Sequence, residues 1–335
     1  MTHLFFSKSS KWLGLVLGLC FFAVSFLSSI AFGQIPISFR TIVDAFLDFD
    51  QNSTEHIIIT TTRITRAVIA TVIGVSLSIA GALMQALTKN HLASPSIFGI
   101  NSGAVFFIVL SMSLFSISSL KHYMWVGFLG AGVSAIMVYF LGSLGRDGLS
   151  PVKIVLSGAA ITALFLSLTQ GLLIINGQNL EGVLFWLAGS IAGRTMDMLK
   201  PILPFIIGGW IMALFLGHPV NILTSGEDIA KGLGQRTVLV KTLMAVAIIF
   251  LAGGSVAVGG SIGFIGLIVP HIVRGLVGND HKWIIPYCGL FGASLLLLAD
   301  IVSRFIIMPQ EVPIGVMTAL IGTPFFISIA RRGLR

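Results

Sequence analysis

The chain of 335 residues carries little charge, since only 10% of its residues are Asp, Glu, Lys or Arg, whereas 56% are hydrophobic. Soluble domains are about a quarter charged, so this composition excludes a water-soluble globule. Cysteine is scarce as well, and both residues, Cys20 and Cys288, lie inside apolar runs. In such surroundings a thiol serves as a small buried hydrophobe, so we expect no disulfide, no metal site and no redox chemistry.

The sequence also lacks a Gly-x-x-x-x-Gly-Lys-Ser/Thr segment, the loop that holds nucleotide phosphates. We therefore expect no ATP hydrolysis in this chain. The net charge of +8 could favour nucleic acid, but the basic residues are scattered between apolar runs and do not gather on one polar face. Nucleic-acid binding is excluded on that ground.

Apolar runs of membrane-spanning length are what the chain has in abundance. About 20 apolar residues are needed to cross a hydrocarbon core of roughly 30 Å. We predict an all-α, polytopic membrane protein that forms one transmembrane domain over residues 1–335, with ten spans and additional short interfacial helices. The first run is longer than a signal-peptide core and is expected to stay as an uncleaved span. The predicted spans are 12–32, 62–85, 95–117, 123–143, 152–175, 197–216, 238–258, 262–278, 284–306 and 311–330.

The distribution of Lys and Arg predicts the orientation. Ten spans place both termini on one side, and cytoplasmic loops are enriched in basic residues. The side of the termini receives Lys8, Lys11, Lys89, Arg146, Lys153, Lys231, Arg236, Lys241, Arg274, Lys282, Arg331, Arg332 and Arg335, and the other side only Arg40, Arg63, Arg66, Lys121, Arg194, Lys200 and Arg304. We therefore expect both termini to be cytoplasmic.

Arginines stand at the outer mouths of two spans. Arg63 and Arg66 are three residues apart and share a helix face. They either snorkel to the interface or form a cationic patch for a partner, because guanidinium can hold a carboxylate by two hydrogen bonds. On the ninth span, Asp300 and Arg304 are four residues apart and can neutralise each other. We expect Asp300 to serve packing and Arg304 to stay free at the outer surface.

The longest polar loop on the side of the termini runs over residues 218–236. A serine and a glycine there can begin a short helix, two acids favour its positive N-terminal end, and two glycines can end it. The loop is either a capped surface turn or a protruding helix that a motor subunit could grip. The residues that carry this prediction are Ser225, Gly226, Glu227, Asp228, Ala230, Gly232, Leu233 and Gly234.

A glycine-rich stretch follows over residues 253–280. Dense glycine allows close approach between helices, and a span broken by Gly or Pro must be buried against protein or water. We expect His271, next to Pro270, to be structural. The residues assigned to helix packing are Gly259, Gly260, Gly263, Gly266, Pro270 and Asp300.

In their order and type, these motifs resemble the permease subunits of the bacterial iron-siderophore and cobalamin ABC importers, the class with ten spans per subunit. The resemblance covers about 260 residues. It rests on Arg63, Arg66, Gly74, Gly81, Gln85, Asn90, Leu92, Ala93, Pro95, Gly99 and Gly103, on Trp186, Gly189 and Ser190, on residues 226–234, and on matches between 263 and 324. Two segments depart from the family pattern: His91 replaces a usual proline, and residues 149–151 differ.

The resemblance implies that the chain is not an enzyme, holds no cofactor of its own and works with partner subunits. Two permease subunits, identical or related, would pair around a central pathway, two separate ATPase subunits would bind ATP and Mg, and an external binding protein would deliver the ligand. Residues 226–234 would be the coupling helix for the ATPase. Arg63, Arg66 and Arg304 would meet glutamates of the binding protein. The cytoplasmic gate would involve Asn90, His91, Leu92, Ser150 and Pro151.

The expected function is a permease in the bacterial cytoplasmic membrane that imports ferric siderophores, with cobalamin or haem as alternative cargo. Two other classes remain open. An ion-coupled secondary transporter would use a relay of Asp300, Glu311 and His271. An intramembrane enzyme would use His271 with Asp280 or Asp300, which requires these groups to converge on one wet cavity.

Overall fold

The computed structural model describes residues 7–115, 119–144, 150–175 and 188–333. Over these residues, seven helices are long and apolar enough to cross a membrane. They are α1 (Lys8–Ala31), the continuous helix that ends in α4 (Ile64–Thr88), α6 (Leu120–Ser143), α7 (Pro151–Ile175), α10 (Leu203–Thr224), the run formed by α12 (Thr237–Ile248), η4 (Ile249–Gly253) and α13 (Gly254–Gly259), and α15 (His281–Ser303).

Three shorter apolar helices complete the predicted order of ten, and short elements connect them. The three are α5 (Ile100–Phe115), α14 (Ile265–Val277) and α16 (Ile314–Gly333). The connecting elements are α2 (Phe39–Leu47), α3 (Thr54–Ile57), η1 (Ile58–Arg63), η2 (Pro95–Phe98), α9 (Met196–Leu199) and α11 (Glu227–Gly232). The prediction of an all-α polytopic membrane protein is confirmed.

Two span boundaries were predicted too early. The third helix begins at Ile100 instead of residue 95, because Pro95–Phe98 forms a 3₁₀ turn that Gly99 ends with a φ of 65°. The sixth begins at Leu203 instead of residue 197. In both places a short separate element, η2 or α9, precedes the long helix, and composition alone does not reveal where one ends and the next begins.

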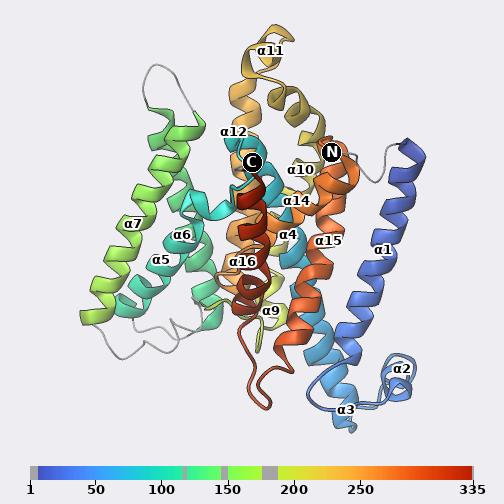
Figure 1. The fold of residues 1–335 in the computed structure, drawn as a ribbon. Coiled ribbons are helices and arrows are strands. Elements are labelled where there is room, and N and C mark those ends of the chain that lie inside the picture. The colour runs from blue at the N-terminus through green and yellow to red at the C-terminus, as the bar shows by residue number, and fades with distance from the viewer. Residues whose placement is uncertain (1–6, 116–118, 145–149, 176–187, 334–335) are drawn as a thin grey trace.

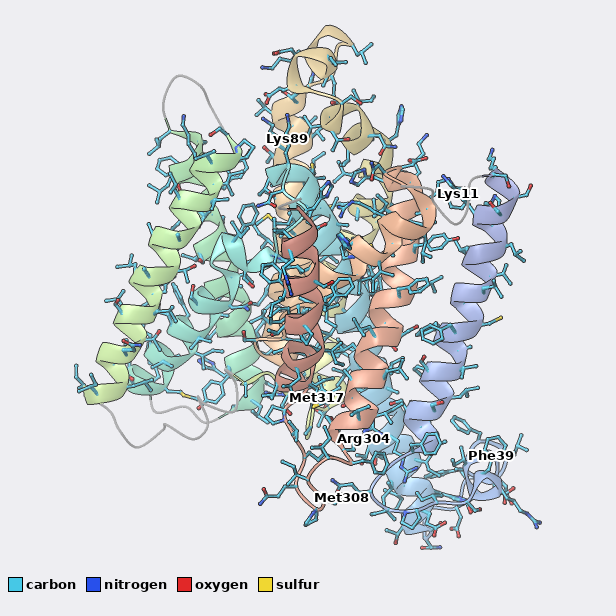
Figure 2. The ribbon with its side chains drawn as sticks, viewed as in Figure 1. Lys11, Phe39, Lys89, Arg304, Met308 and Met317 are labelled. Carbon is cyan, nitrogen blue, oxygen red and sulfur yellow. The ribbon has the colours of Figure 1, made fainter. Side chains whose placement is uncertain are left out.

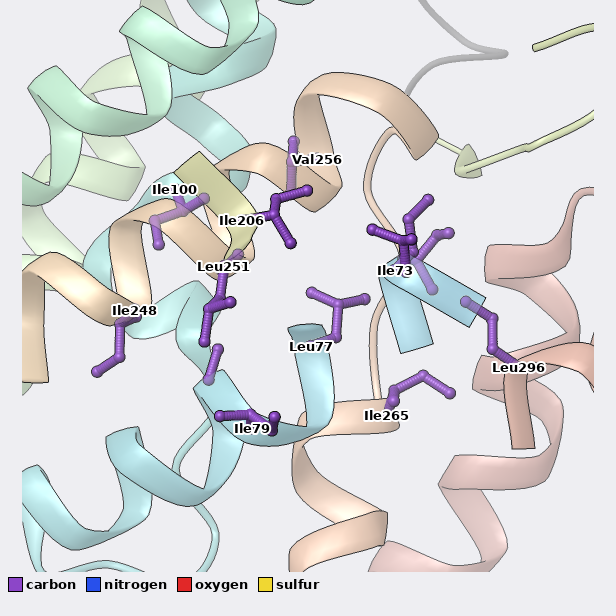
Figure 3. Packing of buried hydrophobic residues seen from close by; sticks show 14 of the residues in the cluster. Ile73, Leu77, Ile79, Ile100, Ile206, Ile248, Leu251, Val256, Ile265 and Leu296 are labelled. Atoms are coloured by element: carbon purple, nitrogen blue, oxygen red, sulfur yellow. The ribbon is translucent and has the colours of Figure 1, made fainter. Parts of the chain in front are cut away.

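α4 lies at the centre of the bundle and packs against α15, α14, α12 and α10 (Figure 1). α1 packs on the outside of α15, and α5, α6 and α7 form a group on the opposite side. Between these helices the core is aliphatic, with Ile73 and Leu77 of α4 near Ile265 of α14 and Leu296 of α15 (Figure 3). Most of α4 is therefore shielded from lipid.

Glycines allow α4 to approach its neighbours closely. A Cβ at Gly81 would overlap the carbonyl oxygen of Gly266 on α14, and a Cβ at Gly259 would lie 2.6 Å from Ile73 Cδ1. The packing assignments of Gly259 and Gly266 agree with these contacts, and Pro270 is buried within α14. The assignment of Gly263 to packing is wrong, since a Cβ there would meet no atom within 4 Å. Gly260 ends α13 with a φ of 74°.

The bundle has two polar ends. One carries α11, the C-terminal end of α4 and the start of α15, and we call it the α11 end (Figure 1). The other carries α2 and α3, and we call it the α3 end. α1 begins and α16 ends at the α11 end. Lys89 and Arg304 mark the two ends in Figure 2.

Candidate functional site

A cluster of three arginines and two acids lies at the α3 end; we call Arg63, Arg66, Asp300, Arg304 and Glu311 the arginine cluster. Arg66 donates Nε and Nη2 to Asp300 Oδ1, at 2.9 and 2.8 Å, and Nη1 to Glu311 Oε2 at 2.7 Å. Asp300, fully buried, also accepts from Arg304 Nη2. Asp300 thus joins two arginines from different helices and does not merely neutralise its neighbour four residues away.

The other two guanidinium groups cap the C-terminal end of α1. The last carbonyls of a helix have no partner within the helix and carry partial negative charge. Arg63 Nη1 donates to the carbonyl oxygens of Ile30 and Ala31, both at 2.8 Å. Arg304 Nη1 donates to the carbonyl oxygens of Ser29 and Phe32, also at 2.8 Å. These two contacts fix the end of α1 against α4 and α15.

The expectation that Arg304 stays free at the outer surface is wrong, because it is 3% exposed and Arg63 is 5% exposed. Both guanidinium groups donate to carbonyl oxygens at the end of α1, and Arg304 also pairs with Asp300. Residue spacing in the sequence does not reveal these partners. The cluster still borders the surface, since all three arginines and Glu311 line a cavity of about 140 Å³. The predicted cationic patch is therefore a recessed cavity and not an exposed face.

The α11 loop has the predicted short helix. Gly226 is the N-cap, with a φ of 137°, and Glu227 and Asp228 occupy the first turn. Ala230 is buried, whereas Ile229 and Leu233 are exposed. Gly234 adopts a φ of 78° after the helix ends. The remaining residues of the prediction lie at its flanks, with Ser225 before the N-cap and Gly232 in the last turn.

Glu227 holds α11 to the following helix. Its Oε2 accepts from Lys241 Nζ at 2.7 Å, and its Oε1 lies 3.4 Å from Lys231 Nζ. The hydrogen bond from Lys241, together with the two positive charges, lowers the pKa of Glu227 below its ordinary value. On the other flank, Asn221 Nδ2 donates to Asp280 Oδ1 at 2.6 Å and so joins the end of α10 to the start of α15. α11 is thus held against α10 and α12, and α10 is in turn joined to α15.

The residues assigned to a gate lie in two segments at the α11 end. Asn90, His91 and Leu92 form an exposed turn after α4, in which Asn90 Oδ1 accepts from Leu92 N at 2.9 Å. Ser150 precedes α7, and Pro151 is its first residue. α7 packs against both α4 and η2, so the two segments belong to neighbouring elements. Trp186 and Leu149, also considered in the sequence, lie outside the described residues.

Among the described residues, no hydrogen bond or ion pair joins His271 to Asp280, Asp300 or Glu311, and the charge that acts on it is that of Arg274. The ring of His271 packs edge-on against Phe325 of α16. Asp280 caps one end of α15, and Asp300 lies 20 residues further along it, about 30 Å at 1.5 Å per residue. The described residues also hold no group of three His, Cys, Asp or Glu side chains suited to a metal ion.

Comparison with known proteins decides the family. The sequence pattern of the FecCD transport family matches residues 21–332. The chain belongs to the FecCD transport family. The resemblance inferred from the motifs is thereby confirmed, and this family member is a multi-pass membrane protein of a transport system.

Individual relatives agree over nearly the full length of the FecCD chain. It is 51% identical over 327 residues to the probable siderophore transport system permease protein YfiZ of Bacillus subtilis, covering 98% of both chains. It is 39% identical to the ferric enterobactin transport system permease protein FepD of Escherichia coli, covering 92% of this chain and 91% of that one. A solved inward-facing structure of a putative metal-chelate type ABC transporter matches with a TM-score of 0.83 at 28% identity, covering 95% and 98%.

Sequence reasoning missed two features of this arrangement. The first is the pairing of Arg66 on α4 with Asp300 on α15 and with Glu311 in the loop before α16. A signal existed, since all three residues stand at the outer ends of predicted spans. The second is a cavity at the α11 end that is lined by basic residues. The sequence feature that could have indicated it is the set of basic residues at the inner ends of several predicted spans.

Proposed function

We propose that this chain is the transmembrane permease subunit of an ATP-driven importer of ferric siderophores. The observation that carries the proposal is 51% identity with a probable siderophore permease over 98% of both chains. In this proposal the chain holds no cofactor, and ATP and Mg are bound by a separate ATPase. The orientation places the α11 end and both termini in the cytoplasm of a bacterial cell, as the distribution of basic residues favours.

The partners of the proposal are a second permease subunit, two ATPase subunits and an external substrate-binding protein. The support for ATPase coupling is α11, which presents exposed Ile229 and Leu233 beside charged side chains. The support for a permease dimer is α7, whose Leu156, Ile174 and Ile175 are exposed and apolar. When ATP binding brings the ATPase subunits together, α11 moves with them, and the two permease subunits tilt so that the pathway between them opens alternately to each side of the membrane.

The binding protein docks, in this proposal, at the α3 end. A carboxylate of the binding protein enters the cavity that Arg63, Arg66 and Arg304 line. Arg66 is the residue it meets, because its side chain is 13% exposed and already binds Glu311, whose side chain is 26% exposed. Arg63 and Arg304 also line the cavity, and their hydrogen bonds to carbonyl oxygens of α1 hold this wall in place.

Transport by reconstituted complexes tests the proposal. The chain is placed in proteoliposomes with its cognate ATPase and ATP inside, and the binding protein and ⁵⁵Fe-loaded siderophore are added outside. We expect uptake that requires ATP and the ATPase and that persists when a protonophore collapses the proton gradient. Uptake by the chain alone, or uptake that the protonophore abolishes, would show a secondary transporter instead.

A further inference from the structure

A second cavity, of about 330 Å³, lies at the α11 end between α4, α10, α14 and α15. Its lining is polar and basic, and none of the described residues that line it is acidic. The residues that matter for its chemistry are Gln85, Lys89, His91, Ser225, Arg274 and His281. The cavity is separate from the arginine cluster, which lies at the other end of the bundle (Figure 2).

His281 presents an unpaired nitrogen there. The residue is 4% exposed, and its Nε2 is buried without a hydrogen-bond partner among the described residues. Asn221 fixes the other nitrogen: its Nδ2 donates to Asp280, so its Oδ1 must be the acceptor that lies 2.9 Å from His281 Nδ1. His281 therefore carries a proton on Nδ1, and Nε2 is left as a hydrogen-bond acceptor for a hydroxyl group of a ligand. An unpaired buried polar atom of this kind is costly unless something binds it.

Two cationic side chains, Arg274 and Lys89, line the same cavity. Arg274 donates Nη1 to Gln85 Oε1 at 2.5 Å, which holds its guanidinium at the cavity and leaves further N–H groups for a ligand. Lys89 is exposed at the C-cap of α4, and it makes no ion pair among the described residues. Asp280, which precedes His281 in the chain, accepts from Asn221 and from the backbone N–H of Lys282. The cavity therefore combines positive charge with unused donors.

We propose that this cavity binds a phosphate group, from an anionic phospholipid headgroup or from a soluble phosphate. Arg274 and Lys89 supply the charge and donate to the phosphate oxygens, and His281 Nε2 accepts from a hydroxyl of the ligand, either P–OH of hydrogen phosphate or a headgroup glycerol hydroxyl. Basic pockets between helices at the cytoplasmic membrane surface have the chemistry that recognises lipid phosphates, and guanidinium is well suited to oxyanions. The lining includes His91 and Ser225, which were assigned to the gate and the coupling loop, but phosphate binding is measured on the purified chain without transport, so the two proposals can fail separately.

The experiment uses the purified full-length chain and two phosphate sources. In one arm, the chain in neutral detergent is titrated with sodium phosphate at constant ionic strength by isothermal calorimetry. In the other, retention of phosphatidylglycerol against phosphatidylcholine is measured by native mass spectrometry after extraction from nanodiscs containing both. Each arm compares the wild type with Lys89→Gln, Arg274→Gln and the control Lys282→Gln, an exposed lysine outside the cavity lining.

We expect Lys89→Gln to weaken binding about fivefold, the ratio that corresponds to about 1 kcal/mol per basic residue near a phosphate. Arg274→Gln should weaken binding at least as much. Lys282→Gln should leave binding unchanged. Lys89 is exposed, so its replacement leaves the fold intact, and an unchanged unfolding temperature verifies this. Saturable phosphate binding with this pattern identifies a soluble phosphate. Selective retention of phosphatidylglycerol with this pattern identifies the headgroup. Absence of binding in both arms, or equal binding by Lys89→Gln and the wild type, would overturn the proposal.

Discussion

At the residue scale, the charge of Asp300 decides the stability of the arginine cluster. It is fully buried and holds Arg66 and Arg304 together. Asp300→Asn leaves two largely buried guanidinium groups without their shared counter-charge, and breaking a buried pair costs about 3–5 kcal/mol. We expect a marked fall in the thermal unfolding midpoint in detergent.

The matched control is Asp44→Asn. Asp44 forms an exposed pair with Arg40 at 3.9 Å, and such pairs contribute little, about 0–1 kcal/mol. Its unfolding midpoint should stay close to that of the wild type. Equal midpoints for the two variants would contradict a stabilising role of Asp300.

Glu311 competes with a docking carboxylate for Arg66. Because it occupies Nη1 of Arg66 at 2.7 Å at the border of the cavity, Glu311→Gln should free positive charge and tighten docking of the binding protein by up to about fivefold. The measurement is the affinity of the cognate binding protein for the permease in nanodiscs. Glu55→Gln, an exposed acid at the same end, is the control. Weaker docking by Glu311→Gln would refute the recessed docking site.

The direction of the arginine side chains could not be predicted from sequence. The sequence placed Arg63, Arg66 and Arg304 at one end of the bundle, which the structure bears out. Whether a guanidinium turns outward or caps a neighbouring helix depends on the end of α1, which lies about 30 residues before Arg63 and about 270 before Arg304. No local pattern carries that information.

At the scale of elements, close backbone contact between α4 and α14 limits what Gly81 can become. Gly81→Ala would push a methyl group into the carbonyl of Gly266, and because backbone cannot move aside as a side chain can, we expect destabilisation of about 1–3 kcal/mol. Gly263→Ala is the control, since its surroundings are open. Unfolding midpoints measure both. A Gly81→Ala chain as stable as Gly263→Ala would mean that the helices separate freely.

The order of α11 should depend on pH through Glu227. Its pKa is lowered in the folded chain, so the stabilisation is complete above the unfolded value of about 4.3 and disappears as the pH falls through the folded value. At neutral pH, Glu227→Gln should speed hydrogen exchange at Ala230 and Leu233, and at strongly acidic pH the two chains should exchange alike. Asp228→Asn on the same helix is the control. A difference that persists in acid would contradict this account.

Helix order was predictable from sequence, because ten apolar runs separated by polar turns leave little choice of topology. α11 was predictable as well, since its acids and glycines have the spacing of a short capped helix. The starts predicted at residues 95 and 197 were wrong, because each falls in a short separate element, η2 or α9, that ends before the long helix begins. The open surroundings of Gly263 depend on where neighbouring helices cross, which a single sequence does not state.

At the scale of the whole molecule, the proposed orientation can be measured with thiol labelling. A Cys20→Ser background removes the one exposed cysteine, and Cys288 is buried. In this background, Arg40→Cys at the α3 end should react with a membrane-impermeant reagent on intact cells. Lys231→Cys at the α11 end should react only after permeabilisation. The reverse pattern would invert the orientation and the assignment of both ends.

α4 gives the molecule a direct mechanical connection between its two surfaces. Its 25 residues form one unbroken helix, about 37 Å long at 1.5 Å per residue. Arg66 stands in its first turn and Lys89 at its C-cap. If α4 moves along its axis as a rigid body, both of its ends are displaced by the same distance. Events on opposite sides of the bilayer can thus be synchronised without a relay of intervening side chains.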